Sequence, residues 1–153
     1  VLRDVLDQAV ITALAGASDP LEIIRDTKAE TVSLTSDLDR LAQVFINLVA
    51  NAQKYCRAEM PQLTIRVAVE ADILTVDFTD NGQGIAPDVQ AVIFEKFFRI
   101  SGEEGEGAGL GLAICHEIMT RLGGEITYAS QASGTTFRVL LPLNSENMFE
   151  ASG

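Results

Sequence analysis

The sequence has no long apolar run, few basic residues and only two cysteines among its 153 residues. No stretch approaches the roughly 20 apolar residues that a membrane-spanning helix needs, and no signal-peptide pattern opens the chain. We therefore expect a soluble domain that works in the cytoplasm. Because the chain begins at Val1 rather than Met, we also expect it to be part of a longer protein, whose own membrane anchoring the sequence leaves open.

Basic residues are scarce, with 11 lysines and arginines against 22 acidic residues and a net charge of −11. Proteins that bind nucleic acids need clustered basic side chains for the phosphates, so we expect no nucleic-acid partner. A small phosphate ligand stays possible, since backbone N–H groups, a helix N-terminus and a metal ion can hold it. Cys56 and Cys115 have neither metal-ligand spacing nor the number of a disulfide framework, so we expect reduced, buried thiols.

Apolar residues are plentiful, at 47% of the chain, which is enough for one domain with one core. Their spacing predicts helical and β-prone segments in a definite order. These segments are a helix over 2–14, β-prone runs at 21–25 and 31–35 that form two strands or a hairpin, a helix starting at an Asp37 N-cap, a hairpin of 63–69 with 74–79, helices over 89–98 and 112–122, and a closing hairpin of 125–128 with 135–141.

The segment Asp80-Asn81-Gly82-Gln83-Gly84-Ile85 follows directly on the predicted strand 74–79. Gly82 and Gly84 have no Cβ, so the backbone there can pass close to a flat ligand. Asp80 at the strand end could accept a hydrogen bond from an amino group such as that of adenine, a contribution of roughly 1.5–3 kcal/mol. The alternative is an ordinary surface turn, because Asp-Asn-Gly is also a common hairpin signal.

The helix after Asp37 has one polar stripe, made of Arg40, Gln43, Asn47, Asn51 and Lys54. Two asparagines one turn apart, followed by a lysine, present amide oxygens and then a positive charge. This arrangement suits a hydrated Mg²⁺ ion that carries phosphates. The alternative is a solvated helix face.

A glycine-rich stretch, residues 107–111, precedes the predicted helix 112–122. The residues before it, 101–107, include no apolar side chain and predict a mobile loop. A glycine-rich loop that opens a helix is typical of an anion site, stabilised by roughly 0.3–2 kcal/mol through the helix dipole. The pattern fits neither the dinucleotide fingerprint nor the P-loop.

The order of these pieces resembles the ATP-binding catalytic domain of bacterial sensor histidine kinases, members of the Bergerat-fold ATPase superfamily. The resemblance covers residues 1–143 and leaves 144–153 as a frayed, disordered tail. It implies an α/β fold, a two-layer α+β sandwich in which a mixed, mostly antiparallel sheet of about five strands packs on about three helices, with a flexible ATP lid. The matching motifs are the N box at 47–55, the first glycine box at 80–85, the F box at 94–99 and the second glycine box at 107–112.

The resemblance also implies roles for individual residues. Asp80 would bind the adenine amino group, and Asn47 and Asn51 would hold Mg²⁺ and phosphates and serve in catalysis together with Lys54. The glycines of the second glycine box would form the lid and phosphate cradle. The remaining implied ATP-binding residues are Tyr55, Gly82, Gly84, Ile85, Phe97, Arg99, Gly107, Gly109, Leu110, Gly111 and Leu112.

The position of Asn47 bears on the phosphoryl acceptor. Hydrolysing and serine-phosphorylating relatives have a glutamate there as general base, whereas a neutral histidine acceptor needs no base. We therefore expect transfer of the γ-phosphoryl group of ATP to a histidine, with catalysis by positioning and charge neutralisation. The resemblance implies two partners outside this chain, namely a dimerisation and phosphoacceptor domain and a downstream response regulator.

His116 is the only histidine, and its surroundings superficially resemble the acceptor motif of the family. Arg121 stands where that motif has proline, so we expect His116 to be an ordinary helix-surface residue.

Two other functions stay open from the sequence. One is a degenerate nucleotide-binding interaction module without turnover. The other is an anti-sigma-type serine kinase, against which Asn47 and the complete F box count.

Overall fold

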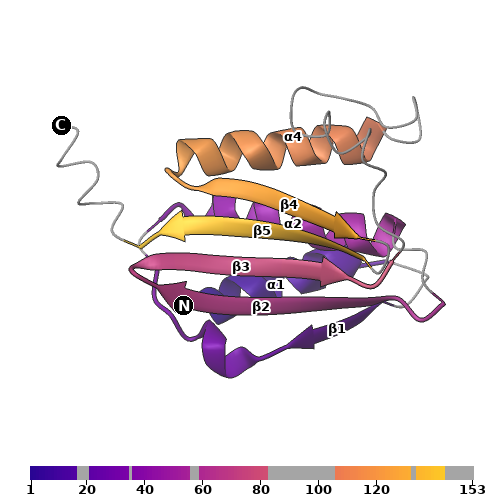
Figure 1. The fold of residues 1–153 in the computed structure, drawn as a ribbon, viewed down its shortest axis with the longest axis horizontal. Helices are drawn as coiled ribbons and strands as arrows, with labels where there is room; N and C mark the ends of the chain where they lie inside the picture. Colours follow the sequence, from indigo (N-terminus) through magenta and orange to yellow (C-terminus); the bar gives the residue numbers. More distant parts are fainter. Residues whose placement is uncertain (17–20, 35, 56–58, 83–105, 132–133, 144–153) are drawn as a thin grey trace.

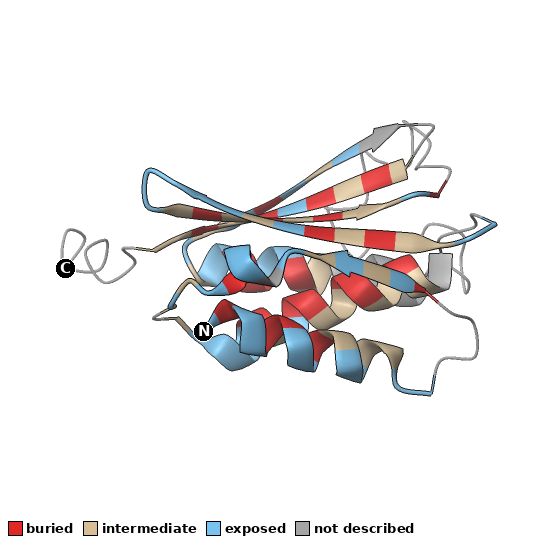
Figure 2. Ribbon diagram, turned by 90° about the horizontal axis from the view of Figure 1, so that it is seen from below, coloured by how far each residue is buried: buried red, intermediate tan, exposed pale blue. Residues whose placement is uncertain are grey.

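The fold has two layers, a five-stranded sheet and a set of helices that cover one of its faces (Figures 1 and 2). The computed structural model describes residues 1–16, 21–34, 36–55, 59–82, 106–131 and 134–143. The elements are α1 (Leu2–Leu14), β1 (Glu22–Arg25), a 3₁₀ turn η1 (Thr27–Glu30), α2 (Leu38–Tyr55), β2 (Gln62–Glu70), β3 (Ile73–Asp80), α4 (Glu106–Arg121), β4 (Glu125–Gln131) and β5 (Gly134–Pro142). The predicted two-layer α/β class is confirmed. Within the described ranges, no helix is long and apolar enough to cross a membrane.

The sheet is mixed and mostly antiparallel, with strand order β1-β2-β3-β5-β4. Only β1 runs parallel to its neighbour β2, and the other three pairings are antiparallel. Alternate residues of each central strand point at the helices, as the period-two pattern predicts. Both predicted hairpins, β2 with β3 and β4 with β5, are confirmed.

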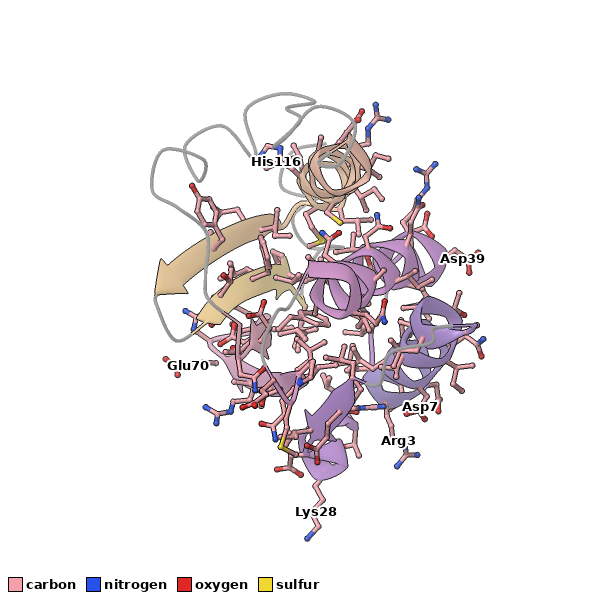
Figure 3. All side chains as sticks on the ribbon, turned by 90° about the vertical axis from the view of Figure 1, so that its right-hand side faces the viewer. Arg3, Asp7, Lys28, Asp39, Glu70 and His116 are labelled. Atoms are coloured by element: carbon pink, nitrogen blue, oxygen red, sulfur yellow. The ribbon has the colours of Figure 1, made fainter. Side chains whose placement is uncertain are left out.

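The core lies between the sheet and the helices, with α2 packed between α1 and α4 (Figure 3). Phe45 of α2 meets Phe78 of β3 with ring centroids 5.5 Å apart. Both rings are fully buried, so this contact joins the two layers. As predicted, the Asp37 side chain caps α2, accepting a hydrogen bond from the backbone N–H of Arg40 at 3.2 Å.

The run at 31–35 was predicted as β-prone, and the strand expectation is wrong for its described residues 31–34. These residues have no regular secondary structure and follow η1, which Asp26 caps and whose buried Glu30 forms an ion pair with Arg25. Arg25 also contacts Asp7 of α1 at 2.8 Å. Val32 then accepts a hydrogen bond from the N–H of Leu2 at 3.0 Å, so its backbone anchors the start of α1 rather than pairing with β1.

The helix predicted over 112–122 begins at Glu106, so the predicted start is wrong. Residues 107–111 are helical although each glycine costs roughly 1 kcal/mol in a helix interior. Glu106, Ala108 and Leu110 are strong helix formers that offset part of this cost. The loop predicted over 101–107 is wrong at 106 and 107, which are helical. Its other residues lie outside the described residues, as do the helix predicted at 89–98 and the tail at 144–153.

Candidate functional site

The site begins at Asp80, where β3 ends. Its Oδ1 accepts hydrogen bonds from two backbone N–H groups, those of Gly82 at 2.9 Å and Thr135 at 3.3 Å. In the described part of the chain, Oδ2 of the same carboxylate accepts none. Two donors on one oxygen fix the orientation of the carboxylate and leave its other oxygen available to a further donor.

Gly134 and Thr135 are the site residues that sequence reasoning missed. Gly134 has φ +146°, and a Cβ built on it would overlap the backbone carbonyl oxygen of Asp80. This close approach lets the next residue, Thr135, direct its N–H at Asp80. The sequence marks Gly134 only as a turn glycine, because the approach depends on β5 pairing with β3, which no local pattern encodes.

Asn81, the middle residue of the turn, has a structural role. Its Oδ1 accepts from the N–H of Gln62 at 2.9 Å, and its Nδ2 donates to the carbonyl of Met60 at 3.0 Å. These bonds tie the turn to the start of β2. The Asp80–Gly82 turn is therefore held from both neighbouring strands, which makes it more than a surface turn.

The polar stripe on α2 is only partly a solvated face. Arg40 and Gln43 are exposed, as a solvated face requires, but Asn47 and Asn51 are half-buried. The Nδ2 atom of Asn51 is itself buried and has no hydrogen-bond partner within the described chain. An unpaired buried amide costs roughly 1–3 kcal/mol, and such a cost is often retained at functional sites.

Cys115 of α4 faces Asn47 across the α2–α4 contact. Its Sγ accepts from Asn47 Nδ2 at 3.6 Å and donates to the carbonyl of Val44 at 3.8 Å. Burial raises the pKa of the Cys115 thiol to about 12. The prediction of a buried thiol is confirmed for Cys115, and Cys56 lies outside the described residues.

The other predicted site residues divide into those that the structure describes and those outside the described ranges. Lys54 and Tyr55 lie on the last turn of α2, and 107–112 lie on the first turns of α4. The ends of α2 and β3 and the start of α4 share one end of the domain, on the right in Figure 1. Free backbone N–H groups belong to the first turn of a helix, so they lie near Gly107 rather than Gly111. The members outside the described residues are Gly84, Ile85, Phe97 and Arg99.

The residue types at the site indicate which cation it could bind. Within the described residues, no group of three or more His, Cys, Asp and Glu side chains could hold a metal ion. Among the described residues, the predicted ligands at this site are the side-chain amides of Asn47 and Asn51, whose oxygens could bind a cation together with ligand phosphates and water. This set suits Mg²⁺, which keeps several waters and prefers oxygen ligands.

His116 is exposed on α4, as expected for a helix-surface residue (Figure 3). Its backbone carbonyl accepts from the Thr120 hydroxyl at 2.9 Å. One turn further along the same helix, Arg121 pairs with Glu117 at 3.0 Å. The side chains of His116, Glu117, Thr120 and Arg121 thus form an ordinary exposed face of α4.

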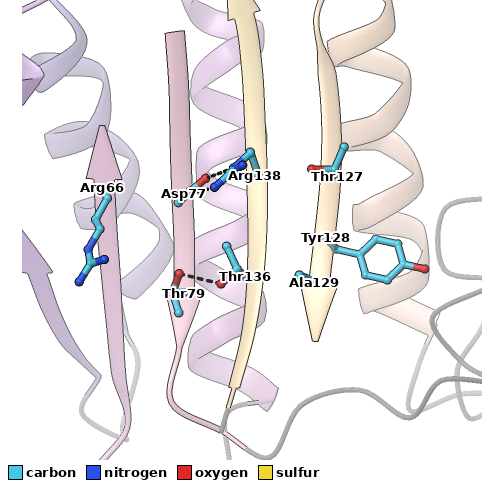
Figure 4. A pocket seen from close by; sticks show the side chains of 8 residues that line it. All are labelled: Arg66, Asp77, Thr79, Thr127, Tyr128, Ala129, Thr136 and Arg138. Carbon is cyan, nitrogen blue, oxygen red and sulfur yellow. Dashed lines mark hydrogen bonds and ion pairs between the residues drawn. The ribbon is translucent and has the colours of Figure 1, made fainter. Parts of the chain in front are cut away.

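A shallow depression of about 400 Å³ lies on the other face of the sheet, away from the helices (Figure 4). Arg138 donates to both carboxylate oxygens of Asp77, at 2.7 and 2.9 Å, and this pairing raises the pKa of Arg138. The hydroxyls of Thr79 and Thr136 pair at 2.9 Å. No predicted site residue lines the depression, so it is separate from the candidate site.

Residues 36–145 match the family of histidine kinase-, DNA gyrase B- and HSP90-like ATPases. The chain belongs to this family. Sensor protein VanS of Enterococcus faecium is 39% identical over 116 residues, which are 74% of this chain and 30% of that protein. The chain is thus a histidine kinase-type ATP-binding domain, similar to the catalytic domains of two-component sensor kinases.

Solved structures agree with this assignment. The nucleotide-free catalytic domain of histidine kinase ThkA matches with a TM-score of 0.75 and 25% identity, covering 93% of this chain and 92% of that one. Full-length ShkA in complex with AMPPNP matches with a TM-score of 0.77 and 26% identity, covering 93% of this chain and 30% of that one. The chain therefore spans less than a third of VanS and of ShkA.

Proposed function

We propose that this domain binds ATP together with Mg²⁺ and transfers the γ-phosphoryl group to a histidine on a dimerisation domain outside this chain. The observation that carries the proposal is the carboxylate of Asp80 at the end of β3. One of its oxygens is held by two backbone N–H groups, and the other is available within the described structure. In a chain of this ATPase family, that oxygen is suited to the amino group of adenine.

Asn51 and Asn47 are the proposed ligands of the cation, with Lys54 as a further contact to phosphate. The buried Nδ2 of Asn51 has no partner within the described chain and supports a place for Asn51 at the site, because a phosphate oxygen of a bound nucleotide would accept its hydrogen bond. Bound Mg²⁺ would supply charge neutralisation for the phosphates. The chain's own residues bind and orient the nucleotide at the shared end of α2, β3 and α4.

The acceptor is proposed from the surroundings of Asn47. Asn47 occupies the position of the general-base glutamate in hydrolysing relatives, and an amide cannot take a proton there. The Cys115 thiol beside it is no base at neutral pH, because burial raises its pKa to about 12. A neutral imidazole needs no base in order to attack, so histidine is the acceptor that this site favours.

Titration calorimetry tests nucleotide binding. We expect a non-hydrolysable ATP analogue to bind the chain in the micromolar to sub-millimolar range, and more tightly with Mg²⁺. Absence of binding in a folded sample would favour the degenerate interaction module.

Phosphoryl transfer is the second test. The chain is mixed with ATP and a histidine-bearing dimerisation domain, and we expect an acid-labile phosphate on that domain. A response regulator is then the proposed downstream partner, and the cytoplasm, where ATP is available, is the proposed location. An acid-stable phosphate on a serine or threonine would support the serine kinase instead.

A further inference from the structure

Cys115 of α4 makes polar contacts to α2 through its thiol, one to the side chain of Asn47 and one to the backbone of Val44. The thiol is fully buried at this helix contact. Its two partners, Val44 and Asn47, lie about one turn apart on α2, so the sulfur bridges a backbone carbonyl and a side-chain amide. Neither partner of the sulfur belongs to the Asp80–Gly82 turn.

The bridge selects one orientation of the amide. A thiol has a single hydrogen to donate, and here the carbonyl of Val44 receives it. Toward Asn47 the sulfur can therefore act only as an acceptor, so it faces the amide nitrogen, at 3.6 Å. The nitrogen and oxygen of an amide point in different directions from its carbon, so with the nitrogen turned to Cys115 the oxygen of Asn47 does not face the sulfur.

We propose that Cys115 is a positioning residue for the Mg²⁺-nucleotide site, acting through the amide of Asn47. Its thiol accepts a hydrogen bond from the nitrogen of that amide and so orients the oxygen toward the proposed cation site. The oxygen is the only atom of the amide that can bind a cation. This inference rests on the proposed function, in which Asn47 contacts the cation and phosphates. It adds a residue of α4 that lies outside the motif boxes.

A packing role for Cys115 predicts a different response to substitution. Cys115→Val keeps the volume and apolar character of the side chain but removes both hydrogen bonds. Cys115→Ser keeps a donor and an acceptor but places a hydroxyl in an apolar contact. Packing alone would make the valine variant the better tolerated one, whereas positioning makes the serine variant the better one for Mg²⁺-dependent binding.

The experiment is calorimetric titration of the chain with a non-hydrolysable ATP analogue, with and without Mg²⁺. The quantity compared is the ratio of the two affinities. We expect Cys115→Val to lower this ratio about three- to tenfold, the range of one lost hydrogen bond, and Cys115→Ser to keep it within about twofold. The proposal would be overturned if the affinity ratio of Cys115→Val equals that of the wild-type chain, or if both variants lower the ratio by the same factor.

A double-mutant cycle then asks whether the effect passes through Asn47. In an Asn47→Ala background, Cys115→Val should cause no further loss of the ratio. An undiminished loss in that background would show that Cys115 acts by another route and would overturn the proposal.

Side-chain amide NMR separates failure of this inference from failure of the proposed function. In the nucleotide-free chain, Cys115→Val should shift the NH₂ resonances of Asn47 and largely spare those of Asn81, which binds elsewhere. If the shift appears but the wild-type chain shows no Mg²⁺-dependent binding, the proposed function has failed and the positioning role falls with it. If the Asn47 resonances do not move, the contact is absent and the inference alone is overturned.

Discussion

Thr135 donates its backbone N–H to the carboxylate of Asp80 at 3.3 Å, across 55 positions of the sequence. The bond joins the first residues of β5 to the last residue of β3. Thr79 and Thr136 pair beside it through their hydroxyls. The proposed adenine-binding carboxylate is therefore oriented by the sheet itself.

Asp80→Asn should weaken nucleotide binding at least about tenfold, or about 1.4 kcal/mol, because an amide replaces the charged acceptor. Titration calorimetry measures the change. Asp77→Asn is the matched control, since Asp77 lies on the same strand but pairs with Arg138 on the outer face. Unchanged affinity in Asp80→Asn would remove Asp80 from the site.

Gly134→Ala should lower both stability and nucleotide affinity, because the new Cβ would displace the carbonyl of Asp80. We expect a loss of about 2–4 kcal/mol in unfolding free energy, measured by denaturant titration. Gly123→Ala is the control, because Gly123 also has a positive φ, 82°, but nothing lies within 4 Å of its added Cβ. It should cost about 1–2 kcal/mol without changing affinity in the folded protein. Equal affinity in both variants would contradict the role given to Gly134.

Asn51→Ala should abolish the Mg²⁺ dependence of nucleotide binding. It should not lower the unfolding free energy of the free domain through loss of a hydrogen bond. The Nδ2 of Asn51 is buried and has no partner in the described chain, so its removal forfeits no bond there. Gln43→Ala, on the exposed part of the same stripe, is the control and should leave both properties unchanged. Full enhancement by Mg²⁺ in Asn51→Ala would place the cation elsewhere.

The Cys115 thiol should make folding stability fall at alkaline pH. Its pKa rises from 9.0 to about 12 through burial, so above pH 9 the unfolded state loses a proton that the folded state keeps. The contribution is fully present below pH 9 and falls by up to about 1.4 kcal/mol per pH unit as pH rises toward 12. Denaturant titrations of the wild type and of Cys115→Val at several pH values measure this contribution as the difference between their unfolding free energies, since the other groups titrate alike in both. Parallel stability curves above pH 9 would contradict the prediction.

The sequence by itself determined the elements with regular local patterns and the motifs between them. The Asp37 cap, the alternation in β2 and β3, and the order of Asn47, Asn51 and Asp80 can all be read from near neighbours along the chain. Family membership follows from the same order of motifs. Local spacing and turn chemistry act within a few residues, so these features need no knowledge of the fold.

Only the tertiary structure decided how distant residues meet. The pairing of β5 with β3 brings Thr135 to Asp80, and the packing of α4 on α2 brings Cys115 to Asn47. The structure likewise shows that α4 begins at Glu106 despite its glycines and that residues 31–34 support α1 instead of forming a strand. For the contacts at Asp80, Asn47 and Leu2, the deciding energy comes from burial and hydrogen bonds between segments far apart in sequence, which outweigh local propensity.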